Sequence, residues 1–149
     1  MLELEMKRRK LYGFIYNMRI AALDIAKKQI GLAFSDEEQS FIAFETTLKT
    51  KNFNYFLRQL DEYFLYYKPM CTYIGINEEK YGESHEFIQH FSENLSKIIG
   101  KYEFLNEDFS TFEAKYMVDE GYIKIFSSVD SIVARSLIYQ AISKTKNLF

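Results

Sequence analysis

The sequence predicts an α/β domain built on a mixed five-stranded sheet whose first three strands run antiparallel. The chain has 149 residues, 48% of them hydrophobic and 27% charged, which is the size and composition of one folded domain. Short apolar runs alternate with amphipathic stretches in the order strand, strand, strand, helix, strand, helix, strand, helix, helix. We assign residues 18–149 to this domain and treat residues 1–17 as an N-terminal extension, either flexible or created by a misplaced start.

The three opening strands follow from short apolar runs separated by turns. Residues 19–24 and 29–35 are apolar and lie only a few residues apart, a spacing typical of a hairpin. Residues 41–48 form the third strand, in which a period of two places three residues on one face: Phe44, Thr46 and Leu48.

Amphipathic helices alternate with the remaining strands. Asn52 caps a helix whose apolar residues recur every three or four positions, and Pro69 ends that region. These apolar residues are Phe53, Phe56, Leu57, Leu60 and Phe64. Residues 84–99 form a second amphipathic helix, closed by Gly100. Two short strands complete the sheet, at residues 71–76 and 102–105.

The C-terminal part of the chain predicts two more helices. Ser110 and Glu113 form a capping box, so a third helix begins at Ser110 and ends near Gly121. The last helix spans residues 129–146.

Charge and cysteine content exclude several classes of protein. The chain carries 19 basic and 21 acidic residues, a net charge of −2, whereas a protein held by non-specific phosphate contacts is normally basic. A nucleic-acid role must therefore rest on a local patch or on metal ions. The single cysteine, Cys71, makes no internal disulfide and indicates a reducing, cytoplasmic setting. No apolar run of about 18 residues is present, which excludes a spanning helix.

The aromatic content of 17% has two explanations. Aromatic side chains serve as base-stacking platforms in nucleic-acid-binding proteins. Codon usage in an AT-rich genome explains the same composition more simply, because it favours Phe and Tyr over Trp and Pro.

Three acidic residues stand where packing alone does not favour them. Asp24 ends the buried first strand, Glu107 follows the fifth strand, and Asp130 lies in the first turn of the last helix. The carboxyl ends of adjacent strands form the ligand crevice of an open α/β sheet, so Asp24 and Glu107 meet there if their strands are close. Converging carboxylates attract a hard divalent cation such as Mg²⁺. Two such ions about 4 Å apart promote phosphodiester hydrolysis.

Each of these acids also has an ordinary structural explanation. Asp130 interacts favourably with a helix N-terminus, and Glu107 and Asp108 are typical loop charges. Asp24 is the hardest to explain in that way, because an acid at the end of an apolar strand costs desolvation energy unless it has a partner.

Four ordered segments resemble the YqgF (RuvX) family. Residues 18–36 (MRIAALDIAKKQIGLAFSD) are similar to the family's opening, roughly MRILGLDIGTKRIGVAxSD. Residues 73–77 (YIGIN), 106–114 (NEDFSTFEA) and 129–140 (VDSIVARSLIYQ) are similar to its motifs VVGLP, DERLTTxEA and VDxIAAxxILQ. The resemblance spans residues 18 to about 142.

The resemblance implies a ribonuclease H-like fold and an Mg²⁺- or Mn²⁺-dependent nuclease of the bacterial cytoplasm. The family's acid triad corresponds to Asp24, Glu107 and Asp130, which would bind the metal and carry out catalysis. The implied role is 5′-end maturation of pre-16S rRNA in ribosome biogenesis, and the alternative is a Holliday-junction resolvase acting on branched DNA. The partner is accordingly RNA or branched DNA and not a membrane, and such folds often form homodimers when they cut junctions.

Substrate contacts are expected around this triad. We expect Lys28 to contact phosphate and Ser110 or Thr111 to orient the scissile region.

Departures from the family pattern support a second interpretation. Ala26 replaces a turn glycine, Gln29 a basic residue and Asn77 a proline. Asn106 and Asp108 replace the family's Asp and Arg, and loss of the arginine removes a phosphate contact and adds negative charge beside the metal. The alternative is therefore a catalytically weakened ribonuclease H-like scaffold that binds nucleic acid.

Overall fold

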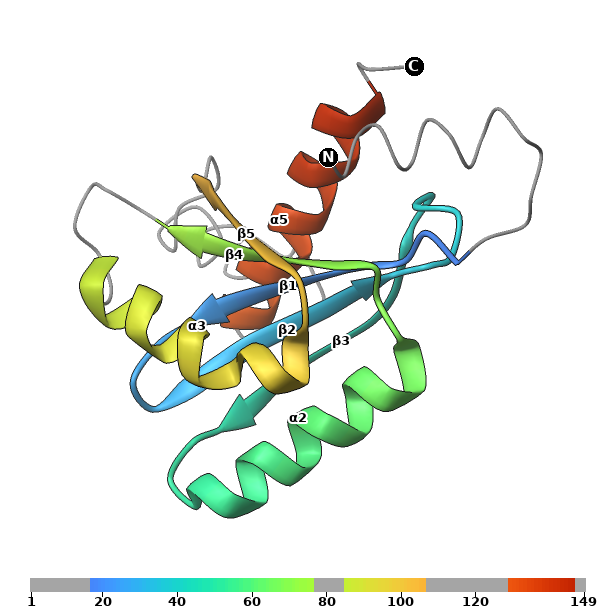
Figure 1. Ribbon diagram of the computed structural model, residues 1–149. Helices are drawn as coiled ribbons and strands as arrows, with labels where there is room; N and C mark the ends of the chain where they lie inside the picture. The colour runs from blue at the N-terminus through green and yellow to red at the C-terminus, as the bar shows by residue number, and fades with distance from the viewer. Residues whose placement is uncertain (1–16, 77–84, 107–128, 147–149) are drawn as a thin grey trace.

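A single mixed sheet forms the centre of the computed structural model, which describes residues 17–76, 85–106 and 129–146 (Figure 1). Its strands are β1 (Ile20–Ile25), β2 (Gln29–Ser35), β3 (Ile42–Lys49), β4 (Cys71–Ile76) and β5 (Tyr102–Asn106). The spatial order is β3-β2-β1-β4-β5. Strands β1, β2 and β3 pair antiparallel, whereas β1–β4 and β4–β5 pair parallel. The predicted fold class, with its antiparallel opening, is confirmed.

Helices cover both faces of this sheet. Helices α2 (Phe53–Tyr67) and α3 (His85–Ile99) lie on one face, and α5 (Val129–Lys146) crosses the other (Figure 1). The side chains of the central strand β1 point alternately to the two faces of the sheet, and both faces are buried. Leu23 and Ile25 pack towards α2 and α3, and Ile20 and Ala22 pack towards α5. The two cores explain why the central strands are almost continuously apolar.

Helix α2 begins and ends with capping residues. The Asn52 side-chain Oδ1 accepts a hydrogen bond from the Tyr55 backbone N–H at 3.1 Å. At the other end Lys68 adopts a left-handed conformation with φ of 49°, and Pro69 follows it. Phe56, Leu60 and Phe64 are buried as the helical period predicts. Phe53, which the helical period groups with them, is 44% exposed, so that part of the prediction is wrong. Because it is the first residue of α2, no preceding helical turn covers it, and its ring contacts are with Phe56 and Phe91.

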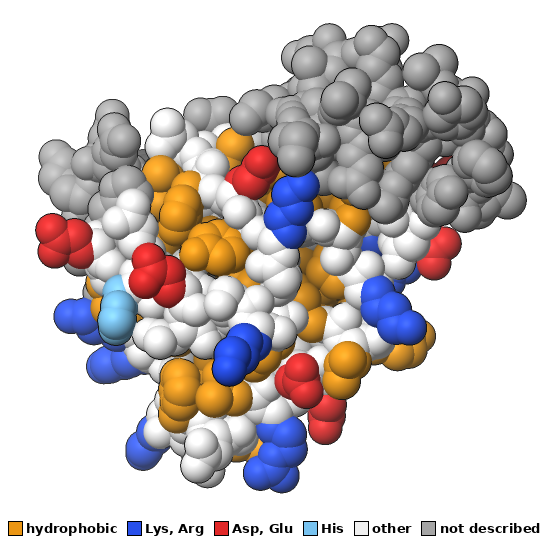
Figure 2. Space-filling view, viewed as in Figure 1, with side chains coloured by type: hydrophobic (Ala, Val, Ile, Leu, Met, Phe, Trp, Pro, Cys, Tyr) orange, Lys and Arg blue, Asp and Glu red, His pale blue; other side chains and the backbone are white. Residues whose placement is uncertain are grey.

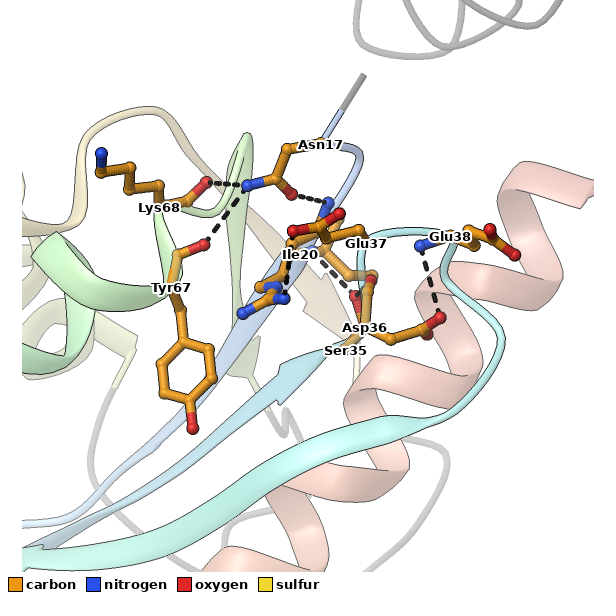
Figure 3. A network of polar contacts seen from close by, with 9 residues as sticks. Asn17, Ile20, Ser35, Asp36, Glu37, Glu38, Tyr67 and Lys68 are labelled. Carbon is orange, nitrogen blue, oxygen red and sulfur yellow. Dashed lines mark hydrogen bonds and ion pairs between the residues drawn. The ribbon is translucent and has the colours of Figure 1, made fainter. Parts of the chain in front are cut away.

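A polar network closes the end of the sheet where β1 begins (Figure 3). The Asn17 side chain donates hydrogen bonds to the carbonyl oxygens of Tyr67 and Lys68, and it accepts one from the Arg19 backbone N–H at 2.9 Å. The Ser35 hydroxyl accepts a hydrogen bond from the Ile20 N–H, also at 2.9 Å. These contacts tie the chain entering β1 to the end of α2 and to the end of β2.

The remaining predictions agree with the structure wherever it describes the residues. Gly100 follows α3 with a φ of +68°, which is the expected glycine cap. The helix predicted from Ser110 to Gly121 lies outside the described residues, and so do residues 1–16 of the predicted extension. Within the described part of the chain, none of the helices has the length and apolar character needed to span a membrane.

Candidate active site

Asp24 lies at the carboxyl end of β1 and is half-buried there. Because β1, β4 and β5 are parallel, their carboxyl ends meet at one edge of the sheet. Strand β4 separates β1 from β5, so the ends of β1 and β5 are about 10 Å apart, two strand spacings. The topology therefore meets the condition that the sequence left open, namely that the first and fifth strands end close together.

The Asp24 side chain projects from the face that α5 covers. Ile20 and Ala22 belong to the same core cluster as Ala134 and Leu137 of α5. Side chains two residues apart on a strand share a face, so Asp24 lies on this face as well.

Helix α5 crosses the strands of the sheet obliquely (Figure 1). Arg135 contacts Glu45 in the middle of β3, and Tyr139, one turn later, lines a hollow beside Phe41 and Ile42 at the start of β3. Strand β3 is parallel to β1, because both pair antiparallel with β2. Contacts along α5 therefore move from the middle of β3 towards its start, while Gln140 of the same helix reaches the end of β5 on the other side of the sheet.

Asp130 lies in the first turn of α5, five residues before Arg135. Glu45 is opposite Ala33, which is opposite Ala22, so the contact between Arg135 and Glu45 marks the level of Ala22 on the sheet. The Asp130 side chain itself is outside the description.

The other predicted site residues flank this end or lie outside the description. Glu107, Ser110 and Thr111 are outside the described residues, but Glu107 directly follows Asn106, the last residue of β5. The Gln140 side chain of α5 donates a hydrogen bond of 3.0 Å to the Asn106 carbonyl oxygen, which ties the end of β5 to the same helix. Among the residues whose side chains are described, no group of three His, Cys, Asp or Glu could hold a metal ion.

Lys28 lies in the turn between β1 and β2, four residues after Asp24 along the chain, and is exposed. The Ala26 N–H donates a 3.1 Å hydrogen bond to the Gln29 carbonyl oxygen and closes this turn. Ala26 is not among the described residues with positive φ, so the hairpin forms regularly although alanine stands where the family has glycine. Lys28 is thus held at the same end of the sheet as Asp24.

An ion pair that the sequence analysis missed fixes α5 to the sheet. Arg135 Nε donates to Glu45 Oε2 at 2.6 Å, and Arg135 Nη2 donates to Glu45 Oε1, so the contact is bidentate. The hydrogen bond to Glu45 raises the pKa of Arg135. The sequence shows a charged residue in each of two largely apolar elements, Arg135 in α5 and Glu45 in β3. Nothing in the sequence indicates that these two residues contact each other.

Asp36, the last residue of the opening motif, organises a turn. Its Oδ1 accepts backbone hydrogen bonds from Ser40 at 2.6 Å and from Phe41 at 2.9 Å, and its Oδ2 accepts one from Glu38 at 3.3 Å, drawn in Figure 3. This carboxylate lies at the opposite end of the sheet from Asp24 and shapes the connection between β2 and β3.

Comparison with known proteins agrees with this geometry. The sequence matches the model of the RuvX family, described as Holliday junction resolvase, over residues 18–144. The chain belongs to the RuvX family. The resemblance seen in the sequence is thereby confirmed, and with it the general class of the chain, a nuclease family whose members hydrolyse nucleic acid. Among curated proteins, none matches this chain.

Solved structures with the same fold support the ribonuclease H-like assignment of this RuvX domain. RuvC of T. thermophilus in complex with a Holliday junction substrate aligns with a TM-score of 0.59 at 12% identity, covering 88% of this chain and 98% of that one. The fowlpox virus Holliday junction resolvase aligns with a TM-score of 0.54 at 13% identity, covering 89% of this chain and 100% of that one.

Proposed function

We propose that this RuvX-family chain is a metal-dependent endonuclease of the cytoplasm that hydrolyses phosphodiester bonds of structured RNA, with 5′-end maturation of pre-16S rRNA as its role. Asp24, Glu107 and Asp130 bind the metal and form the catalytic centre. The observation that carries this proposal is the half-buried Asp24 at the carboxyl end of the central strand, where the parallel strands β1, β4 and β5 end.

The donor set of this centre fits a hard divalent cation. Three carboxylates supply oxygen ligands, which Mg²⁺ and Mn²⁺ prefer. Histidine or cysteine ligands would favour a softer metal, and the proposed centre contains neither. A bound Mg²⁺ or Mn²⁺ would supply an activated water and stabilise the leaving oxygen. Asp24, held in a rigid central strand, sets the position of the ligands.

The protein itself supplies substrate contacts around this centre. Lys28, exposed in the β1–β2 turn, contacts a phosphate beside the scissile bond. Ser110 and Thr111, which follow the Glu107 segment in the sequence, orient the scissile region.

The test is cleavage of a pre-16S rRNA leader fragment in the presence of Mn²⁺. Asp24→Asn should abolish cleavage, whereas the matched control Asp61→Asn, which changes an exposed residue of α2, should cut like the wild type. Mn²⁺ should also raise the melting temperature of the wild type and of Asp61→Asn but not of Asp24→Asn, because a ligand that binds only the native state stabilises it. A folded wild type that binds Mn²⁺ and leaves every substrate intact would contradict the proposal and favour the scaffold.

The second candidate substrate is branched DNA. The matched family model is described as Holliday junction resolvase, and the T. thermophilus RuvC structure with a similar fold holds a junction substrate. A four-way DNA junction therefore belongs in the same assay, and cutting of the junction with the leader left intact would assign the DNA substrate. Paired incisions of a junction require two centres, so a homodimer is expected in that case and light scattering of the complex would detect it.

A further inference from the structure

A groove of about 830 Å³ runs between the edge strand β3 and the start of α2. Polar, basic and aromatic side chains line it, among them Thr46, Thr47, Lys49, Lys51, Phe53 and Tyr55. No acidic residue is among the described residues that form its walls. In a chain whose net charge is −2, a groove with only basic charges is a specific feature and not a reflection of composition.

The lysines of this groove are available to a ligand. Lys49 and Lys51 are exposed, and neither forms an ion pair with another described residue. The Thr50 N–H donates a hydrogen bond of 3.1 Å to the Lys28 carbonyl oxygen, which joins the end of β3 to the β1–β2 turn. Lys28, at the same end of the sheet as Asp24, is therefore joined through its backbone to the segment that carries Lys49 and Lys51.

Two exposed aromatic rings stand at the start of α2 in the wall of the groove. Phe53 is 44% exposed and Tyr55 is 53% exposed, in a protein that buries Phe56 of the same helix completely. Phe53 is held by edge-on contact with Phe91, at a centroid distance of 6.3 Å. Figure 2 shows basic, acidic and hydrophobic side chains interspersed along the lower edge of the molecule, where α2 and the end of β3 lie, and the acidic ones are not among the residues that line the groove. Exposed aromatic rings beside basic side chains are typical of sites that bind single-stranded nucleic acid.

The groove is close to Asp24 in the sheet. Thr47 is opposite Gly31, which is opposite Asp24, so Thr47 and Asp24 lie at the same level. Two strand spacings put their Cα atoms roughly 10 Å apart. The α2 wall of the groove is on the other face of the sheet from the Asp24 side chain, so a strand that reaches both must pass around the edge strand β3.

We propose that this groove binds a single-stranded segment of the nucleic-acid substrate, with phosphates on Lys49 and Lys51 and a base stacked on Tyr55. The inference rests on the proposed nuclease function and adds the part of the substrate that this surface recognises. A single strand is required because a ring can stack only on a base face that the duplex leaves open. The segment is RNA or DNA, which share the phosphates and base faces that the groove contacts.

The test measures binding without metal, so that no cleavage occurs. Fluorescence anisotropy of the full chain with a labelled hairpin duplex, blunt or carrying a six-nucleotide single-stranded tail, isolates the contribution of the tail, and RNA and DNA versions distinguish the two sources. Lys49→Gln with Lys51→Gln should abolish the preference for the tail and lower the slope of log affinity against log salt by about 1.4, two contacts at about 0.7 each. Tyr55→Ala should weaken binding of the tailed duplex roughly tenfold.

Matched controls lie elsewhere on the same chain. Lys68→Gln with Lys101→Gln removes two exposed lysines near the opposite end of the sheet, and Tyr66→Ala removes a tyrosine of α2 that is 78% exposed. The controls should bind both duplexes like the wild type. If the groove variants, folded by circular dichroism, bind the tailed duplex as tightly as their controls, the groove proposal is wrong.

Cleavage measured in parallel separates this proposal from the proposed function. If the wild type cuts and the groove variants bind normally, the groove proposal is wrong and the proposed nuclease function is supported. If the wild type binds the tail through Lys49, Lys51 and Tyr55 but cuts nothing with Mn²⁺, the proposed nuclease function is wrong and the groove proposal is supported. If both the proposed nuclease function and the groove proposal are correct, the groove variants should raise KM for tailed substrate more than they lower kcat.

Discussion

Removing the guanidinium of Arg135 tests whether one bidentate contact holds α5 against the edge of the sheet. The side chains of Arg135 and Glu45 are 31% and 17% exposed, so the pair is mostly but not fully removed from water. Hydrogen bonds to charged groups contribute about 1.5–3 kcal/mol in protected sites, and exposed pairs contribute about 0–1 kcal/mol. For two such bonds at partial exposure we expect Arg135→Met to cost about 2 kcal/mol, a fall in melting temperature of roughly 4–8 °C.

Urea unfolding followed by circular dichroism measures this cost. The control Arg58→Met removes an exposed arginine from α2 and should change stability by less than about 0.5 kcal/mol. Glu45→Gln and the double variant complete a mutant cycle, in which we expect a coupling energy of about 1–2 kcal/mol. Additive effects in that cycle, or a loss for Arg135→Met no larger than for Arg58→Met, would refute the view that the pair anchors the helix.

The same variant also tests how α5 contributes to the site. Arg135 lies five residues after Asp130 and touches neither metal nor substrate in the proposed mechanism, so it is a positioning residue. Loosening the N-terminal half of α5 should weaken the stabilisation by Mn²⁺ even at temperatures where the protein stays folded. A variant of reduced stability that retains the full Mn²⁺-dependent shift would limit the role of Arg135 to folding.

Three smaller perturbations test the local interactions of individual residues. Asn52→Ala removes the side-chain oxygen that caps the Tyr55 N–H and should cost about 1 kcal/mol in urea unfolding. Gly100→Ala should cost about 1 kcal/mol in the same assay, because φ is +68° and the added methyl meets no atom within 4 Å, so only backbone strain acts. Burial raises the pKa of Tyr67 above 10.0, so its neutral form is the stabilised one: its contribution is complete below pH 10 and is lost as the pH rises through the folded-state value. Tyr67→Phe should therefore reduce the loss of stability above pH 10, measured by thermal unfolding, and an unchanged pH dependence would contradict this.

The local elements were predictable because short-range patterns determine them. The strand at Gln29–Ser35 and the helix at Val129–Lys146 have the bounds that periodicity predicts. The Asn52 cap and the Gly100 cap also depend only on residues a few positions away. The prediction that Phe53 is buried was wrong because the helical period identifies the buried face of a helix but not how completely each residue on that face is covered.

The site was predictable only in part because it depends on contacts that are distant in the sequence. The pattern identified Asp24 as a costly acid at a strand end, but the insertion of β4 between β1 and β5 follows from the topology. Arg135 and Glu45 are 90 positions apart, and no local pattern pairs them. The groove likewise combines residues of β3 and α2, which sequence periods treat as separate elements.

The distribution of charge explains how an acidic chain can present a surface suited to phosphate. Among the described acids, Glu45 is neutralised by Arg135, the Asp36 carboxylate accepts backbone N–H groups, and Glu37 lies 3.7 Å from Arg19. The last two are at the end of the sheet opposite Asp24, whereas Lys49 and Lys51 are near the Asp24 end without an ion pair to any described residue. Because screening limits exposed charges to a range of about 8–10 Å, an approaching phosphate responds to these local lysines and not to the net charge of −2. In the function proposed above, attraction to substrate and attraction to metal are separated in space, with lysines on the edge of the sheet and the carboxylate of Asp24 on its central strand.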